Sequence, residues 1–180
     1  MEEKKKEMVD SCNFRDVGPI MMELPYPPIK VNCQNQTYAN ILSIDYCGAV
    51  SELSAITQYI NSHGRMSLER CELAKTILGI AIAEMIHLQK LGQLIQLLGG
   101  CLDFKARYRE EEKIWTPEYL KLPDDTRKIL TVSIEGERAA INQYRRHIRM
   151  IKDNNINAVL ARIIKDEEYH ILMLQALMKD

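Results

Sequence analysis

Two copies of the pattern Glu-x-x-His, Glu84–His87 and Glu167–His170, interrupt stretches that otherwise have the apolar spacing of buried helical faces. Three residues along a helix rise about 4.5 Å and rotate through roughly 300°, so the carboxylate and the imidazole of each pair share one face. An ionised carboxylate in a dry interior is strongly destabilising unless it is protonated, paired or bound to a metal ion. The chain must therefore fold so that these buried groups are compensated.

Single glutamates complete the pattern. When the buried face of each helical stretch is written at alternating steps of three and four, Glu52 and Glu137 fall near the middle of the two remaining faces. No Lys or Arg lies on the central part of any of these faces, so cations from outside the chain would have to balance the carboxylates. The sequence thus predicts two transition-metal ions per chain, iron or manganese, with six ligands: Glu52, Glu84, His87, Glu137, Glu167 and His170.

The helical patterns predict an all-α protein. Residues 1–36 are expected to form an irregular arm, because Gly18-Pro19 and the prolines of 25–28 prevent a long helix. Residues 37–180 are expected to form the metal-binding domain. No window shows sustained alternation of apolar and polar residues, so no strand is expected. Four helices follow the arm, at about Thr37–Asn61 with Gly64 as a left-handed cap, from Ser67 to Gly99-Gly100, from Asp124 or Asp125 to about Lys152, and after a turn at Asp153-Asn154-Asn155.

The second and third helices are separated by a connection of about 25 residues that contains Thr116-Pro117, a cap followed by a first-turn proline. The other connections are short, so their helices are antiparallel neighbours. This connectivity predicts an antiparallel four-helix bundle made of two helical hairpins joined by one long crossover.

Composition excludes several classes of protein. A length of 180 residues fits one domain, and a net charge of −1 gives no electrostatic case for nucleic acid as a partner. The start of the chain lacks the apolar segment of a secretory signal, and no apolar run is long enough to span a bilayer. The five cysteines are scattered and form no Cys-x-x-Cys, so neither a disulfide framework nor a rubredoxin-type site is expected. These features predict a cytoplasmic protein with no membrane partner.

Several polar residues near the predicted ligands have two interpretations. Glu135 competes with Glu137 but lies about 200° away, off the apolar face, so Glu137 is favoured. Asp166 either hydrogen-bonds a ligand histidine or lies at the surface. Asp45 either lies behind the metal site or at an open end of the bundle, and the second is favoured. Glu168 is expected to be solvated, and no function is needed for the two remaining histidines, His63 and His147.

Beyond these patterns, the chain resembles the di-metal ferritin-like superfamily, which includes bacterioferritin, rubrerythrin and manganese catalase. The resemblance covers roughly residues 37–180. Residues 26–28, 48–55 and Gln58-Tyr59 are most similar to manganese-catalase-like and spore-coat catalase-like proteins, whereas 137–141 with Tyr144 resembles the third helix of rubrerythrin-like proteins. The resemblance implies a ferritin-like fold, and it makes Tyr59 the candidate catalytic residue because family members place a tyrosine beside the metal pair. Tyr144 is given less weight.

The resemblance also implies chemistry. It favours an oxidoreductase that acts on hydrogen peroxide or dioxygen, peroxidase- or catalase-like, and assembles as a homo-oligomer. The chain lacks the rubredoxin cysteine pairs of rubrerythrin proper, so a peroxidase would need an external electron donor. A ferroxidase that stores iron is the second interpretation, and a catalase-like structural coat protein is the third.

Overall fold

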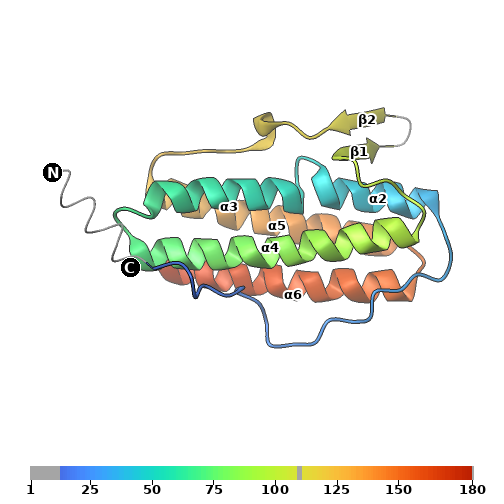
Figure 1. Ribbon diagram of the computed structural model, residues 1–180, viewed down its shortest axis with the longest axis horizontal. Helices are drawn as coiled ribbons and strands as arrows, with labels where there is room; N and C mark the ends of the chain where they lie inside the picture. The colour runs from blue at the N-terminus through green and yellow to red at the C-terminus, as the bar shows by residue number, and fades with distance from the viewer. Residues whose placement is uncertain (1–12, 109–110, 180) are drawn as a thin grey trace.

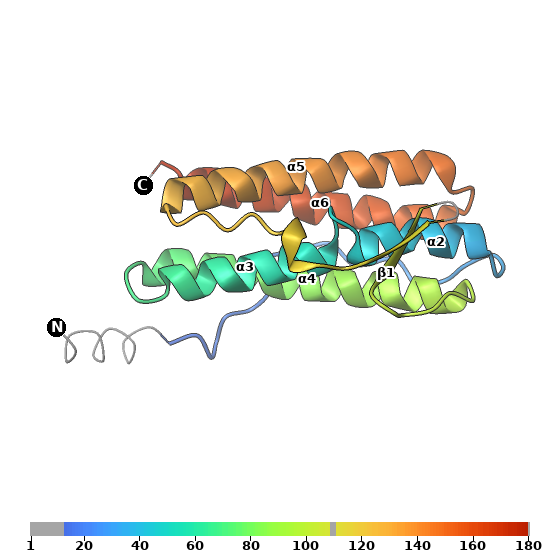
Figure 2. The same cartoon turned by 90° about the horizontal axis from the view of Figure 1, so that it is seen from above.

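Helices that run antiparallel along one axis dominate the computed structural model, which describes residues 13–108 and 111–179 (Figure 1). In chain order the described elements are α2 (Gln36–Cys47), α3 (Glu52–Met66), α4 (Cys71–Leu97), β1 (Lys105–Tyr108), β2 (Glu111–Ile114), a 3₁₀ turn (Pro117–Tyr119), α5 (Thr126–Met150) and α6 (Asn154–Leu177). Figure 2 shows two layers, with α2, α3 and α4 in one and α5 and α6 in the other. The crossover joins the layers, so the predicted pair of helical hairpins is confirmed.

The first predicted helix is wrong in one respect, because the structure divides it into α2 and α3. Gly48 leaves the helix with extended backbone (φ −76°, ψ −170°), and Ser51 caps α3 by accepting a hydrogen bond from the Ser54 amide. The Ser54 hydroxyl donates to the Gly48 carbonyl at 3.0 Å, which ties the two sides of the break together. The cap at Ser51 makes Glu52 the first residue of α3, so the break positions a predicted ligand.

Other helix ends agree with the sequence to different degrees. Gly64 does not end its helix, since α3 continues to Met66, and α4 begins at Cys71 rather than near Ser67. The break after α4 is confirmed, because Gly99 has a positive φ of 84° that favours glycine. The predicted third helix is capped by Asp125, one of its two expected starting residues. The aspartate of the predicted turn, Asp153, caps α6 in the same way.

The all-α fold class is confirmed, but the expectation of no strand is wrong, because the crossover contains a short antiparallel hairpin in which Lys105 pairs with Ile114 and Tyr108 with Glu111. Each strand has only four residues, too few for alternation to be recognised in the sequence. Beyond the hairpin, the Trp115 indole donates to the Ser54 hydroxyl at 3.0 Å, so the crossover is attached to the start of α3 (Figure 1).

The described part of the N-terminal arm, residues 13–35, has neither helix nor strand, as its prolines predict. It runs along the α4 and α6 side of the bundle (Figure 1). The Ile20 amide donates to the carbonyl of Gly79 in α4, and the Asn35 amide donates to the carbonyl of Leu98, both at 3.0 Å.

Buried apolar side chains form two clusters. The first lies around α2, the end of α4 and the start of α6, and includes Leu42, Leu94 and Leu160. The second lies around the end of α3, the start of α4 and the start of α5, and includes Ile77 and Leu130. The predicted ligands belong to neither cluster. They form a buried polar layer of the bundle.

Cysteines follow the sequence prediction in part. Cys33 and Cys101 are exposed free thiols and Cys47 is a buried free thiol, so no disulfide framework joins these three, whereas Cys71 is disulfide-bonded. Across the described ranges, none of the helices combines the length and apolar character that crossing a membrane requires.

Candidate metal centre

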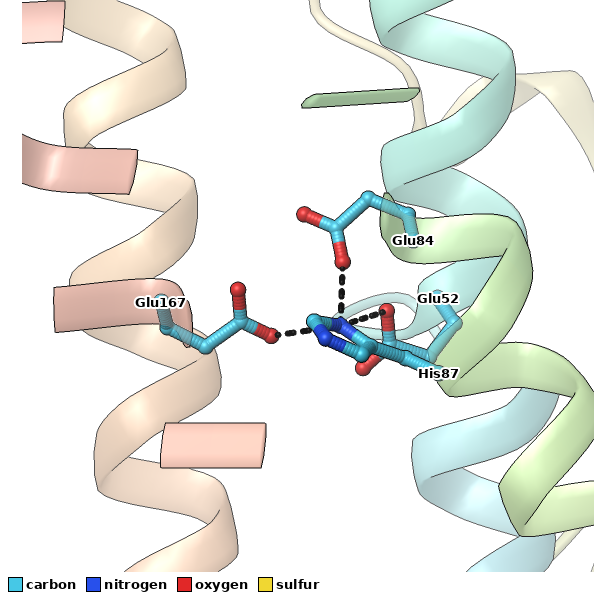
Figure 3. A group of neighbouring side chains, drawn as sticks. All are labelled: Glu52, Glu84, His87 and Glu167. Carbon is cyan, nitrogen blue, oxygen red and sulfur yellow. Dashed lines mark hydrogen bonds and ion pairs between the residues drawn. The ribbon is translucent and has the colours of Figure 1, made fainter. Parts of the chain in front are cut away.

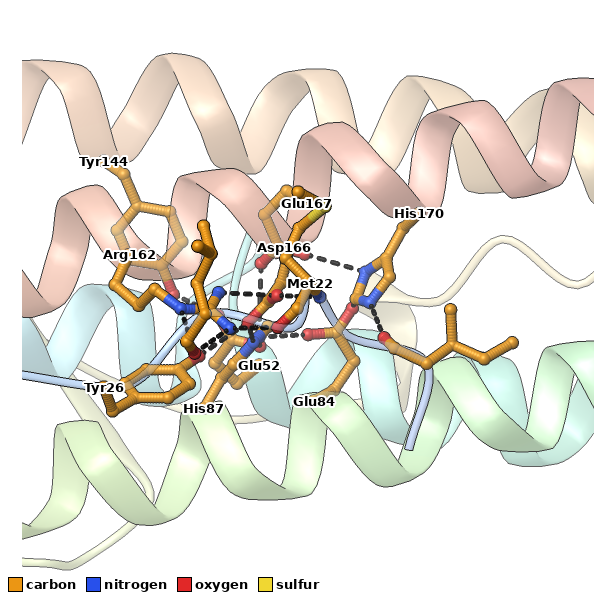
Figure 4. A network of polar contacts seen from close by, with 12 residues as sticks. Met22, Tyr26, Glu52, Glu84, His87, Tyr144, Arg162, Asp166, Glu167 and His170 are labelled. Carbon is orange, nitrogen blue, oxygen red and sulfur yellow. Dashed lines mark hydrogen bonds and ion pairs between the residues drawn. The ribbon is translucent and has the colours of Figure 1, made fainter. Parts of the chain in front are cut away.

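The six predicted ligands meet at one level of the bundle, although they come from four helices. Each has at most 3% of its surface exposed. Glu52 begins α3, whereas Glu137 lies in the middle of α5. The two Glu-x-x-His pairs, Glu84–His87 on α4 and Glu167–His170 on α6, face each other across the core (Figure 4).

One group surrounds the imidazole of His87 (Figure 3). Its Nδ1 atom lies 2.7 Å from Glu84 Oε2, 3.4 Å from Glu167 Oε1 and 3.5 Å from Glu52 Oε2. The four ligand atoms of this group all lie within 4.8 Å of one another. One nitrogen and three carboxylate oxygens at this spacing can share a single cation.

A second group of the same kind surrounds His170. Its Nδ1 atom lies 2.9 Å from Glu167 Oε2, 3.3 Å from Glu84 Oε1 and 3.6 Å from Glu137 Oε1. Glu84 and Glu167 therefore belong to both groups, and each turns one oxygen toward each histidine. Glu137 belongs only to this group, as Glu52 belongs only to the first. The geometry is that of two adjacent cation sites with two shared carboxylates.

Unsatisfied polar atoms support the fit of this site to metal ions. Glu84 Oε1, Glu167 Oε2 and His170 Nδ1 are buried and form no hydrogen bond with the described residues, so their only polar contacts are the ion-pair contacts with one another and within the two groups. A buried polar atom without a partner costs about 1–3 kcal/mol, more when charged. All three atoms point into the two groups, where a cation would satisfy them. Carboxylate oxygens and imidazole nitrogens suit iron and manganese.

Without cations, protons balance the charges of the site. Burial raises the pKa of Glu52 and raises that of Glu137 to about 8, and the charges of Glu84 and Glu167 add to both shifts. Burial alone would raise the pKa of Glu84 as well, but attraction to the two imidazoles outweighs burial and lowers it.

The pKa values of the two imidazoles are raised, in contrast to that of Glu84. Burial by itself lowers the pKa of His87 and His170, yet the surrounding carboxylates outweigh it and raise both pKa values well above the usual one. Carboxylates and protonated imidazoles thus lie together in the core, where a metal ion would replace the protons bound to these side chains.

Two tyrosines secure the unshared carboxylates. The Tyr59 hydroxyl of α3 donates to Glu137 of α5, and the Tyr144 hydroxyl of α5 donates to Glu52 of α3. Burial, followed by the nearby carboxylates, raises the pKa of both phenols well above 10.0, so they remain protonated donors. The sequence interpretation gave more weight to Tyr59, whereas the structure gives the two tyrosines equivalent positions.

Asp166 lies behind the ligands. Of its two interpretations, the structure supports the hydrogen bond to a predicted ligand histidine and not a place at the surface. Asp166 is fully buried, and its Oδ2 atom accepts a hydrogen bond from His87 Nε2 at 3.1 Å. The sequence interpretation missed Arg162, a buried cation one turn earlier whose Nη1 lies 2.6 Å from Asp166 Oδ1. It also missed Tyr26, whose hydroxyl donates to Asp166 Oδ2 at 2.7 Å (Figure 4). The four-residue spacing of Arg162 and Asp166 on one helix was a signal that could have found the first contact.

Asp45 does not lie at an open end of the bundle, which corrects the favoured interpretation. It is buried, and its Oδ2 atom lies 2.7 Å from Nδ1 of His147, which is itself buried.

The competing acid Glu135 lies at the surface, as does Glu168, and His63 contacts the Ala74 carbonyl at 3.0 Å. The structure thus brings together all six predicted ligands and leaves the competing acids outside; that the six bind metal stays a prediction.

A cavity of about 170 Å³ leads to the polar layer between α3 and α5. Its lining includes the partly or fully exposed small residues Ala55, Gly136 and Ala140 and the buried side chains of Glu52, Glu137 and the two tyrosines. Pockets for drug-sized molecules usually have 300–1,000 Å³. This cavity is therefore suited to a very small molecule.

Comparison with known proteins agrees with this architecture. The family model described as a ferritin-like domain matches residues 50–180. No curated protein sequence matches the chain.

Three solved structures with the same fold are distant in sequence. The manganese catalase KatB from Anabaena has 24% identity and a TM-score of 0.73, over 87% of this chain and 78% of that one. Bacterioferritin BfrA from Mycobacterium tuberculosis has 24% identity and a TM-score of 0.66, over 82% and 87%. Bacterioferritin from Desulfovibrio desulfuricans has 23% identity and a TM-score of 0.64, over 80% and 79%. At this identity the likeness establishes the fold alone.

Proposed function

The chain belongs to the ferritin-like family, and from that premise we propose that it is a di-metal oxidoreductase that acts on hydrogen peroxide, catalase- or peroxidase-like. The observation that carries the proposal is the pair of Glu/His groups, which share Glu84 and Glu167 and contain buried polar atoms that form no hydrogen bond. His87 and Glu52 would complete the site of one ion, and His170 and Glu137 that of the other. The donor set favours iron or manganese.

Two such ions, when bound, can exchange two electrons with one small oxidant. The residues of the chain prepare the site for this chemistry. The tyrosine hydroxyls hold the two unshared carboxylates by hydrogen bonds, and the cavity between α3 and α5 admits a molecule of the size of peroxide. Tyr59 lines the cavity and its hydroxyl donates to Glu137, which supports its proposed catalytic role.

Catalase-like disproportionation converts two molecules of hydrogen peroxide into one of dioxygen and two of water, so it needs no other reductant. A manganese catalase is among the solved structures that share this fold, with a TM-score of 0.73, and the cavity is small. Peroxidase activity would require an external electron donor.

Iron oxidation and storage is the second candidate, because bacterioferritins share the fold with TM-scores of 0.66 and 0.64. A storage protein would assemble into a large shell, whereas an enzyme could be a smaller homo-oligomer. A coat protein with an unused metal site is the third candidate, and no described contact favours it.

The test uses protein purified with its native metal, which elemental analysis identifies and counts. We expect oxygen evolution when peroxide is added, followed with an oxygen electrode. Protein that instead consumes oxygen with ferrous iron and retains many iron ions per chain would be a storage protein. Consumption of peroxide only when an electron donor is added would identify a peroxidase. Absence of all three activities in protein that carries two metal ions would contradict the proposal and favour the coat protein.

A further inference from the structure

The N-terminal arm contacts the back of His170 directly. Nε2 of His170 lies 2.8 Å from the carbonyl oxygen of Ile20. A carbonyl can only accept, so Nε2 must carry the proton. When the ring is neutral, its lone pair is then on Nδ1, the atom that faces the carboxylates. The arm therefore selects the tautomer that can bind a cation.

The arm acts on His87 through Asp166. The Asp166 carboxyl group pairs with a guanidinium, because Nη1 of Arg162 lies 2.6 Å from its Oδ1 atom, and it also receives hydrogen bonds from the arm. The carboxylate is therefore an acceptor, and His87 also carries its proton on Nε2. The arm supplies two of the donors, the Met22 amide at 2.8 Å from Oδ1 and the Tyr26 hydroxyl at 2.7 Å from Oδ2 (Figure 4).

The bundle binds this part of the arm at several points. The guanidinium of Arg162 donates to the carbonyl of Met22 at 2.7 Å and of Leu24 at 3.0 Å, and lies 4.5 Å from the centre of the Tyr26 ring. The Ile20 amide donates to the carbonyl of Gly79. These contacts fix the position of the backbone atoms that reach the histidines.

Gly79 is the residue of α4 that permits this close approach. A Cβ atom at this position would lie 2.8 Å from Ile20 Cγ1 and 3.0 Å from the Gly18 carbonyl oxygen. Glycine inside a helix costs about 1 kcal/mol relative to alanine. The fold thus accepts a weaker helix where the arm crosses it.

We propose that residues 20–26 form a strap that completes the metal centre by fixing both ligand histidines in the metal-binding tautomer, and that this strap slows the release of the ions. The proposal rests on the proposed function only in requiring that the site binds metal. The family match begins at residue 50, so the strap lies outside the matched region. Bound metal and a docked strap must stabilise each other equally, because linkage is reciprocal.

Two variants loosen the strap without changing any proposed ligand. Tyr26→Phe removes one donor to Asp166 and keeps the ring, and Gly79→Ala pushes Ile20 away while improving the helix. Their controls are Tyr38→Phe, which removes a hydroxyl that accepts from the Lys152 amide, and Gly64→Ala, which adds a methyl group to a helix where no atom lies within 4 Å.

Each protein is loaded with manganese(II) and mixed with excess chelator, and the metal retained is measured over time. Altering residues behind a metal ligand typically changes metal affinity 10–100-fold, so we expect release at least about tenfold faster from Tyr26→Phe and Gly79→Ala than from wild type. The two controls should release metal at the wild-type rate. Melting of the metal-free proteins identifies any variant that fails to fold, and the other variant then decides.

The outcomes separate the strap from the proposed function. Wild-type protein that binds no manganese or iron overturns both. Wild-type protein that retains two ions, together with a folded strap variant whose release rate is within twofold of wild type, overturns the strap alone. Hydrogen exchange gives an independent readout, because metal loading should slow exchange of the Met22 amide. An unchanged Met22 rate in protein shown to carry both ions also overturns the strap.

Discussion

Replacing shared and unshared carboxylates by glutamine should give different metal contents. Glu84 belongs to both ligand groups, whereas Glu52 and Glu137 each belong to one. Glutamine keeps the shape of the side chain and removes its charge. Glu84→Gln should therefore weaken the binding of both ions. Glu52→Gln or Glu137→Gln should weaken the binding of only the ion in its own group.

The size of the effect follows from the spacing of the ligand atoms. Atoms within 4.8 Å of one another place a central cation closer than about 4 Å to each. Two unit charges 4 Å apart interact by about 4 kcal/mol at an effective dielectric constant of 20. That energy corresponds to roughly a thousandfold change in the dissociation constant for each unit of metal charge. A site that binds micromolar metal in the wild type would then be empty in the variant.

Elemental analysis after gel filtration measures the number of ions per chain. We expect two ions in the wild type, none in Glu84→Gln and one in each unshared variant. Glu168→Gln is the matched control, because Glu168 is adjacent to a shared ligand but pairs with Arg145 at the surface. Retention of both ions by Glu84→Gln, or loss of both from Glu52→Gln, would refute the shared-carboxylate geometry.

Three further predictions concern groups around this layer. Burial raises the pKa of Cys47 to about 12, so iodoacetamide at pH 8 should modify Cys33 and Cys101 but leave Cys47 unmodified until the protein unfolds, as mapped by mass spectrometry. Burial also raises the pKa of Asp45 above 3.8, so the folded state holds this proton more tightly than the unfolded state. Ionisation of Asp45 therefore lowers the free energy of unfolding as the pH rises above 3.8. Asn cannot ionise, so urea unfolding should show a smaller decrease in this free energy from pH 4 to 6 in Asp45→Asn than in wild type. Tyr59→Phe should keep both ions and lower peroxide turnover about tenfold or more, since proton-donating groups typically contribute 10²–10⁴-fold; unchanged turnover would exclude a catalytic role.

The bundle could be predicted because the information that specifies it is local. Helix periodicity, the caps Asp125 and Asp153 and the glycine break at Gly99 each depend on a few neighbouring residues. The six ligands could be selected because a carboxylate on an apolar face is destabilising wherever the helix packs. Their convergence follows once four helices align in one bundle.

Features that depend on distant contacts could not be predicted. Tyr26 and Asp166 are separated by 140 residues, and nothing near Tyr26 in the sequence indicates what its hydroxyl contacts. The break before Ser51 replaces part of a continuous helical pattern, and the adjacent hydrogen bond from Trp115 to Ser54 comes from the crossover. The contact between buried Asp45 and His147 likewise joins residues that are 102 positions apart.

Removal of the metal should leave the helices folded, because the polar layer lies beside two apolar clusters that are independent of it. Fully burying one Leu or Ile side chain stabilises by about 1.5–3 kcal/mol, and each cluster contains several of them, among them Leu42 and Leu94 in one and Ile77 and Ile80 in the other. In the metal-free protein, protons bound to Glu52 and Glu137 reduce the repulsion among the acids. Chelator-treated protein should therefore keep its helical circular dichroism at pH 7 and melt at a lower temperature than the loaded form. Loss of the helical signal would mean that metal binding drives folding, as in a zinc finger, and that the two clusters are insufficient.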